Sequence, residues 1–310
     1  MLGKVIGQQR ILQRNPTPGV TVRYICEDTR TGKERWIWRV PEALCTGTTG
    51  KKSERASALL KLSHDNAARY RAAGRVPELG FITVTEPLDG APLRDQLGRI
   101  SRIDAKQALW LGLQIIQGLA AAHEVGVYHG AVTPEVVWTN ESGQVQLAGF
   151  ELAEAIGGPH RGTHLARIMD TPQMLAPEQL VDTQDITRAD IYQVAATVYM
   201  AWTGHAHLPP LGSDLKFGLE ALIRHHNRNA RELGPRPSER LDDLRRSAPR
   251  LDSLISSMLS SDPARRPIAM EIVKAMWWQC GGAPAPEPTQ MPTAEAAGAA
   301  PLGELPPPVS

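Results

Sequence analysis

Cysteine is scarce and unpatterned in this sequence. The 310 residues contain three cysteines, Cys26, Cys45 and Cys280, and none of them belongs to a CxxC or Cys/His spacing. An odd number without ligand spacing argues against both a disulfide framework and a zinc site. We therefore expect reduced, partly buried thiols.

Long uncharged apolar runs and an excess of one charge are also missing. No run approaches the roughly 18 residues that a membrane span needs, and the start, MLGKVIGQQRILQ, has no apolar core after its lysine. The 34 Lys and Arg against 33 Asp and Glu give a net charge of +1, which provides no attraction for nucleic acid or an anionic membrane. These absences predict a globular, cytoplasmic protein whose main partner is neither nucleic acid nor a membrane.

The last residues, 281–310, lack Lys, Arg and aromatic residues and contain eight prolines. Such a segment has nothing with which to build a core, so we expect a disordered tail. Its LPPPV stretch is compatible with a polyproline ligand, but a plain linker is the preferred interpretation.

Before the tail, the chain divides into two regions that differ in the spacing of their apolar residues. Residues 1–90 alternate in the manner of strands, with a hairpin expected over 19–40, a helix over 51–70 and a strand over 80–88. Residues 91–280 are mostly helical. One long helix is expected from an Asp104 cap to Gly126, with Leu109, Leu113, Ile116 and Ala120 on one face.

A series of spaced motifs resembles the Ser/Thr protein-kinase family, and in particular its prokaryotic members. In chain order they are DTRTGKERWIWRV (28–40), LSHDN (62–66), YHGAVTPEVVWTN (128–140), VQLAGFELA (145–153), DTPQMLAPEQL (170–180), RADIYQVAATVYMAWTG (188–204) and LSSDPARRP (259–267). The resemblance covers roughly residues 7–278 and implies an α+β, bilobal kinase-like fold. We expect a β-rich N-lobe over 1–90 and a helical C-lobe over 91–280.

The family's catalytic groups are replaced in this chain. In the family's catalytic loop, Asp accepts the substrate proton, Lys steadies the phosphoryl group and Asn holds magnesium; the matching residues here are Ala131, Thr133 and Val136. The metal-binding Asp of the family's Asp-Phe-Gly motif becomes Gly149. We therefore expect no cofactor, neither ATP nor magnesium, and no catalytic residue at these positions.

Which residue of this chain occupies the position of the family's ATP-binding lysine depends on the alignment. An ungapped count gives Trp38 and one insertion gives Arg39; the partner glutamate of the next helix is likewise either Glu54 or Arg55. The family positions above and below adenine match Trp36, Trp38 and Trp138. If these indoles point inward, they fill the nucleotide site; the alternative is that they face outward or only enlarge the core.

Other positions match residues that hold the family's fold together. The resemblance assigns structural roles to five residues: His129, Phe150, Glu178, Asp190 and Arg266. Six scattered histidines, His160, His164, His205, His207, His225 and His226, lack a repeated ligand spacing, so no metal site is expected.

Together these substitutions predict a catalytically inactive, kinase-like (pseudokinase) binding or scaffolding protein of intracellular signalling. Its partner is expected to be a protein, either an active kinase or a kinase substrate. The alternative is a kinase or other nucleotide-dependent transferase of altered mechanism and weak activity. That alternative uses Arg39 and a carboxylate: Glu135, Glu151 or Glu154.

Overall fold

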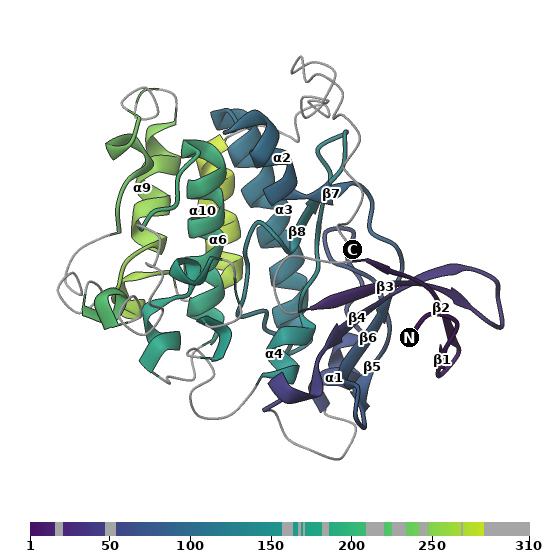
Figure 1. Cartoon of the computed structure of the whole chain (residues 1–310). Coiled ribbons are helices and arrows are strands. Elements are labelled where there is room, and N and C mark those ends of the chain that lie inside the picture. Colours follow the sequence, from purple (N-terminus) through teal and green to yellow (C-terminus); the bar gives the residue numbers. More distant parts are fainter. Residues whose placement is uncertain are drawn as a thin grey trace, which may run out of the picture.

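In the computed structural model a β-sheet from the first part of the chain packs against a larger helical part (Figure 1). The structure describes residues 1–15, 21–46, 54–156, 164–166, 169, 171–181, 186–208, 220–224, 234–241, 246, 248–267 and 269–281. The expected tail lies outside these ranges, except for Gly281, which is the last residue of a helix.

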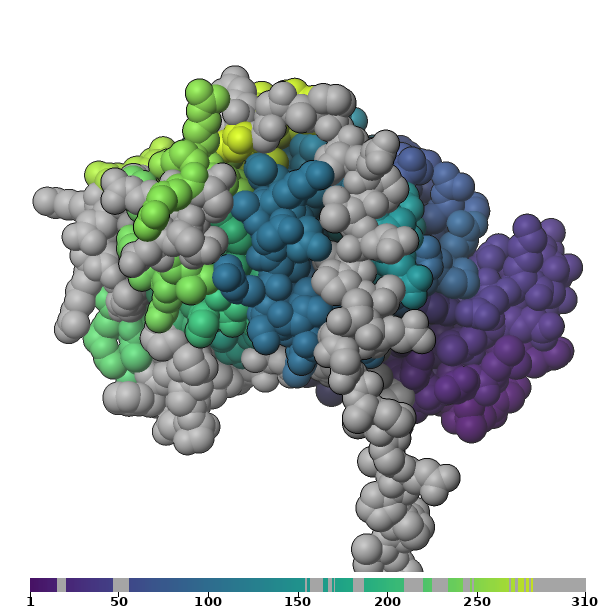
Figure 2. All heavy atoms as spheres, turned by 90° about the horizontal axis from the view of Figure 1, so that it is seen from above, coloured from purple at the N-terminus to yellow at the C-terminus, as the bar shows by residue number. Residues whose placement is uncertain are grey.

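Six strands of the described residues form one antiparallel sheet in the order β1-β2-β3-β4-β6-β5. The strands are β1 (Val5–Ile6), β2 (Gln9–Asn15), β3 (Val22–Asp28), β4 (Glu34–Val40), β5 (Tyr70–Val76) and β6 (Gly80–Thr85). Seen from above, the first part of the chain forms a block at one side of the molecule (Figure 2). The predicted hairpin is present as β3 and β4. Its turn is closed by the Asp28 carboxylate, which accepts from the backbone N–H groups of Arg30 and Thr31, and by Gly32 at φ +67°.

Alternation along β4 decides which side chains reach the helical part. Trp36 and Trp38 belong to the core shared with the helices, whereas Ile37 packs in a separate cluster on the opposite face of the sheet. Arg23 of β3 lies directly opposite Trp38. Because paired residues of antiparallel strands share a face, Arg23 also faces the helical part.

The remaining elements build the helical part. The helices are α1 (Glu54–Leu59), α2 (Leu93–Ile100), α3 (Ala105–Glu124), α4 (Glu151–Ala155), α6 (Ile186–Thr203), α9 (Pro249–Met258) and α10 (Met270–Gly281). Short 3₁₀ turns cover Glu42–Leu44, Pro172–Met174, Pro177–Val181, Pro237–Glu239 and Pro263–Arg265. A small sheet joins β7 (Ala91–Pro92), β8 (Val137–Thr139) and β9 (Val145–Leu147). The predicted α+β class is confirmed. None of the helices in the described ranges combines the length and apolarity that a membrane crossing requires.

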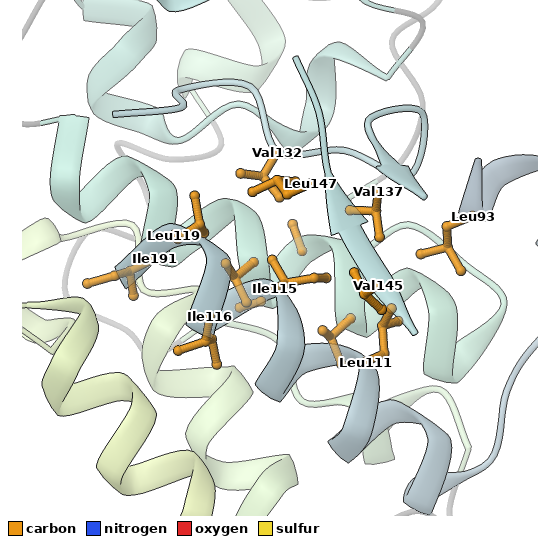
Figure 3. Packing of buried hydrophobic residues seen from close by; sticks show 14 of the residues in the cluster. Leu93, Leu111, Ile115, Ile116, Leu119, Val132, Val137, Val145, Leu147 and Ile191 are labelled. Carbon is orange, nitrogen blue, oxygen red and sulfur yellow. The ribbon is translucent and has the colours of Figure 1, made fainter. Parts of the chain in front are cut away.

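Helix α3 is the centre of the core. It begins at the expected residue, where Asp104 and Gln107 form a reciprocal capping box. It packs against α6, α10 and β9, and Figure 3 shows its side chains among those of β8, β9 and α6. Of the predicted face, Leu113, Ile116 and Ala120 are buried and Leu109 is half-buried. Further buried residues lie beside this face, Leu111, Ile115 and Leu119, because neighbours enclose the helix on several sides.

The helix predicted over 51–70 is wrong in its second half, because α1 ends at Leu59. The Asn66 amide donates to the side chain of Gln114 and to the carbonyl of Val145. The backbone next to it pairs with Leu147 of β9. These bonds hold the segment extended against the helical part, and such tertiary contacts override local helix propensity.

Candidate functional site

The loop that begins at Tyr128 is held by a buried carboxylate. Asp190 of α6 accepts hydrogen bonds from the backbone N–H groups of His129 (3.0 Å) and Gly130 (2.6 Å), and its Oδ2 lies 2.8 Å from Nε2 of His123. Burial alone raises the pKa of Asp190. The bonds and charge from His123 and His129 outweigh burial and hold that pKa below its ordinary value. Asp190 therefore fixes the loop backbone as an ionised acceptor.

Two buried glutamines extend this support and were missed at the sequence level. Gln193 accepts from the N–H of Val132 and donates to Gln179, which in turn donates to the carbonyl of Gly130. Thr197 donates to the carbonyl of Val132. The signal available in the sequence was a row of polar residues at helical spacing within an otherwise apolar α6.

His129 and Phe150 lie together, with ring centroids 4.6 Å apart. His129 Nε2 is 2.7 Å from the carbonyl oxygen of Ala148, and Tyr70 of β5 meets Phe150 edge-on at 6.2 Å. The two expected frame residues are thus brought together and reach the sheet through Tyr70.

None of the four replaced positions offers a charged side chain, and two of them fit closely against each other. Ala131 and Thr133 are buried. Gly149 has φ +91°, and a Cβ placed on it would lie 2.7 Å from Cγ1 of Val136. Val136 and Gly149 therefore fit each other, and an aspartate at position 149 does not fit without rearrangement.

The candidate carboxylates differ in how much of each side chain is exposed to solvent. Glu151 is 1% exposed, its Oε2 accepts from the Tyr70 hydroxyl at 3.3 Å, and burial raises its pKa to about 7. Glu135 keeps 14% of its side chain exposed, with Oε1 3.6 Å from Nη1 of Arg94. One oxygen of each, Oε1 of Glu151 and Oε2 of Glu135, is buried without a hydrogen-bond partner among the described residues. Glu154 lies in α4, and its side chain is not among those that the structure describes.

These residues do not fit a magnesium ion at the position that the family implies. Val136 and Gly149 offer no side-chain oxygen, and within the described ranges no group of three His, Cys, Asp or Glu side chains could hold a metal. Magnesium requires near-octahedral oxygen ligation.

The three tryptophans expected near the nucleotide point inward and form one cluster, here called the tryptophan cage. Trp36, Trp38 and Trp138 are 8%, 7% and 4% exposed, and their ring centroids are 5.3–6.3 Å apart. Hydrogen bonds orient two of the indoles: Trp38 donates to Oγ1 of Thr85 and Trp36 to the carboxylate of Glu34. In this conformation the cage occupies the place that the resemblance assigns to adenine.

Arg39 does not belong to this cluster, contrary to the expected remnant pocket. Its Nε donates to the carbonyl of Leu79 at 2.6 Å, and as an odd-numbered residue of β4 it lies on the opposite face from the cage. Trp38 is therefore the better match to the lysine position. The side chains of Glu54 and Arg55 lie outside the described residues.

Arg23 takes the place beside the cage that was expected of Arg39. Its guanidinium carbon lies 4.3 Å from the ring centroid of Trp36, 4.9 Å from that of Trp138 and 5.6 Å from that of Trp38. Burial lowers its pKa, against the charge of Asp95. The hairpin register would have revealed this residue, because it places Arg23 opposite Trp38.

Glu178 and Arg266 form a buried bidentate ion pair. Nη1 and Nη2 of Arg266 donate to the two carboxylate oxygens at 2.6 and 2.9 Å, and its Nε donates to the carbonyl of Ser260. The guanidinium also lies 4.8 Å from the ring of Tyr192. This pair ties the segment after Leu175 to the turn before α10.

Comparisons with known proteins agree with this frame. A family model described as protein kinase domain matches residues 48–278. The serine/threonine-protein kinase pkn3 of Myxococcus xanthus is 28% identical over 235 residues, which are 74% of this chain and 41% of that protein. PknL of Mycobacterium tuberculosis is 31% identical over 193 residues, 62% of this chain and 44% of that protein. The chain spans less than half the length of these curated relatives.

The fold has solved counterparts. The crystal structure of the Mycobacterium tuberculosis PknI kinase domain superposes with a TM-score of 0.67 at 16% identity, covering 90% of this chain and 98% of that chain. At this identity the likeness establishes the fold alone. It confirms the predicted bilobal kinase-like architecture.

The expected function needs correction. The curated relatives described above are named as serine/threonine-protein kinases, and a further one from Corynebacterium efficiens carries the name "probable serine/threonine-protein kinase". These names contradict the expectation of a catalytically inactive binding or scaffolding protein and fit the alternative better. The physical reason is that losses among groups acting together are not additive, so replaced residues lower a rate without setting it to zero.

Proposed function

Because the chain belongs to the protein kinase domain family, we propose that it is a protein kinase domain of altered mechanism. It transfers the terminal phosphoryl group of a nucleotide to Ser or Thr hydroxyls of a protein, with weak activity. The observation that carries this proposal is the intact hydrogen-bonded frame of the loop from His129 to Val132, held by Asp190 and Gln193. The names of the relatives support the substrate class.

Glu135 is the carboxylate best placed to act in this mechanism. It lies on the same loop, four residues after Ala131, and keeps 14% of its side chain exposed. Glu151 is enclosed against Tyr70 and has no such access. Glu135 accepts the proton of the substrate hydroxyl as the oxygen attacks phosphorus and the bond to the nucleotide diphosphate breaks. Arg94 beside it, with Nη1 3.6 Å from Oε1 of Glu135, orients the carboxylate.

The expected rate is low. Kinases of this kind turn over at roughly 1–100 per second, and a well-positioned general base contributes ~10²–10⁴ of that rate. An unoptimised base alone would therefore reduce turnover to the order of 10⁻⁴ to 1 per second. The altered phosphate contacts lower it further.

The test compares two matched carboxylate variants. Glu135→Gln should lower phosphate transfer at least ~10-fold, because the amide cannot accept the proton. Glu141→Gln, at an exposed position on the same segment, should leave the rate unchanged. Equal rates in the wild type and Glu135→Gln would remove Glu135 from the mechanism, and absence of transfer in all three would remove the proposed function.

The setting of this activity is also proposed. We place the protein in the cytoplasm, and the three free cysteines support this reducing compartment. Its macromolecular partner is then a protein, either a substrate or another kinase. The near-neutral net charge of +1 supports a protein partner over nucleic acid or membrane.

A further inference from the structure

The tryptophan cage joins the two parts of the molecule around one cation. Trp36 and Trp38 come from β4 of the large sheet, Trp138 comes from β8 of the helical part, and Arg23 of β3 lies over all three rings. The indoles are buried and close-packed, with centroids no more than 6.3 Å apart. A planar base cannot stack between β4 and β8 while these rings keep their positions.

The bonding of Arg23 is unusual for a half-buried cation. Its Nε and Nη1 atoms are buried without a hydrogen-bond partner in the part of the chain that the structure describes. The guanidinium is therefore held by the electron-rich faces of the indoles, and the charge of Asp95 on α2 is the opposing charge acting on it. Leaving the buried nitrogens of a cation without hydrogen bonds is costly. Nε and Nη1 therefore gain hydration when Arg23 leaves the cage.

We propose that Arg23 and the tryptophan cage form an autoinhibitory plug in the nucleotide site, which opens when Arg23 and Trp138 move apart. This inference rests on the proposed function for the identity of the ligand, an adenine nucleotide. The closed plug makes nucleotide affinity low in the resting protein. Opening separates the β3–β4 hairpin from β8 and exposes indole faces on which the base stacks.

The plug predicts that variants that loosen it bind nucleotide more tightly. Trp138→Leu removes the ring below the guanidinium, and Arg23→Ala removes the cation above it. Affinity for the nucleotide depends on the fraction of open protein, so each variant should bind ADP at least ~10-fold more tightly than the wild type in isothermal titration calorimetry. The two variants act from opposite lobes, so a folding defect in one leaves the other as the test.

Matched controls come from the same residue types outside the cage. Trp278→Leu removes an indole that is 49% exposed, and Arg35→Ala removes an arginine of β4 that donates to the carbonyl of Glu34. Both should bind ADP as the wild type does. Thermal unfolding of all five proteins in the absence of ligand identifies any variant that is not folded.

The outcomes separate this inference from the proposed function. If the wild type binds ADP as tightly as Trp138→Leu and Arg23→Ala, or if both folded variants bind no more tightly than the controls, there is no plug, whether or not phosphate is transferred. If both variants bind ADP more tightly and neither transfers phosphate, the plug stands and the proposed function fails.

Discussion

At the scale of single residues, the replaced positions are fitted to one another. Val136 fills the space that a side chain at 149 would need, and Gly149 adopts φ +91°, which favours glycine. Restoring one polar group by itself is therefore expected to disturb packing rather than to restore chemistry.

The first prediction concerns Gly149. Gly149→Ala should lower the free energy of unfolding by ~1–3 kcal/mol, because the methyl group meets Val136 and the left-handed backbone disfavours alanine. Gly98→Ala is the control, since no described atom lies within 4 Å of its added Cβ and it lies in α2, where alanine is favoured by up to about 1 kcal/mol. Urea denaturation measures both. Equal midpoints for the two variants would contradict the interlocked pair.

The second prediction concerns the buried Glu151. Its folded-state pKa of about 7 lies above the ordinary glutamate value near 4.5, so the folded protein binds the proton more tightly than the unfolded chain. The resulting stability is fully present below pH ~4.5 and is lost as the pH rises to ~7, by about 3 kcal/mol in total. Glu151→Gln should flatten this slope in denaturation curves between pH 4.5 and 7.

The exposed Glu141 provides the control for that experiment. Glu141→Gln should keep the wild-type slope, because its side chain is open to solvent. Asp190 acts in a different window: its lowered pKa means that its contribution is lost only as the pH falls through that lower value. Parallel curves for the wild type and Glu151→Gln would show that Glu151 is not protonated by burial.

At the scale of elements, the Glu178–Arg266 pair connects two segments that are far apart in the sequence. It links the 3₁₀ turn Pro177–Val181 to the residue that follows the turn Pro263–Arg265. Arg266 also donates to the backbone of Ser260 and Arg188. One side chain therefore organises the carbonyls of two further segments.

The third prediction compares neighbouring arginines. Arg266→Ala should destabilise the fold by ~3–5 kcal/mol, because it leaves the carboxylate of Glu178 in a buried site without its main partner. Arg265→Ala should cost less than about 1 kcal/mol, because its contact with Asp262 is 3.9 Å long and exposed. Chemical denaturation of both variants measures the difference. Similar losses would contradict the structural role of the buried pair.

Elements with strong local signals were predictable. The Asp104 cap and the helical spacing of apolar residues predicted α3, and the turn before Lys33 predicted the β3–β4 hairpin. The helix over 51–70 was over-predicted, because the bonds of Asn66 to α3 and β9 are long-range and leave no local pattern. Sequence periodicity reports local preference, and tertiary hydrogen bonds override it.

At the scale of the whole molecule, one core runs from the sheet into the helical part. Trp36 and Trp38 of the sheet belong to the same buried cluster as α3 and α6. The candidate site lies where this cluster crosses between them. The inward direction of the indoles stayed open at the sequence level, because strand register is weakly specified by sequence. Arg23 was missed for the same reason, and Arg39 was wrongly assigned to that face.

The most direct test of the central claim is transfer of labelled terminal phosphate from ATP to a generic Ser/Thr-containing protein by the purified wild-type chain. We expect slow, nucleotide-dependent label on Ser or Thr that falls at least ~10-fold in a Glu135→Gln preparation made in parallel. Label that is absent from the wild type, or equal in the two preparations, would contradict it.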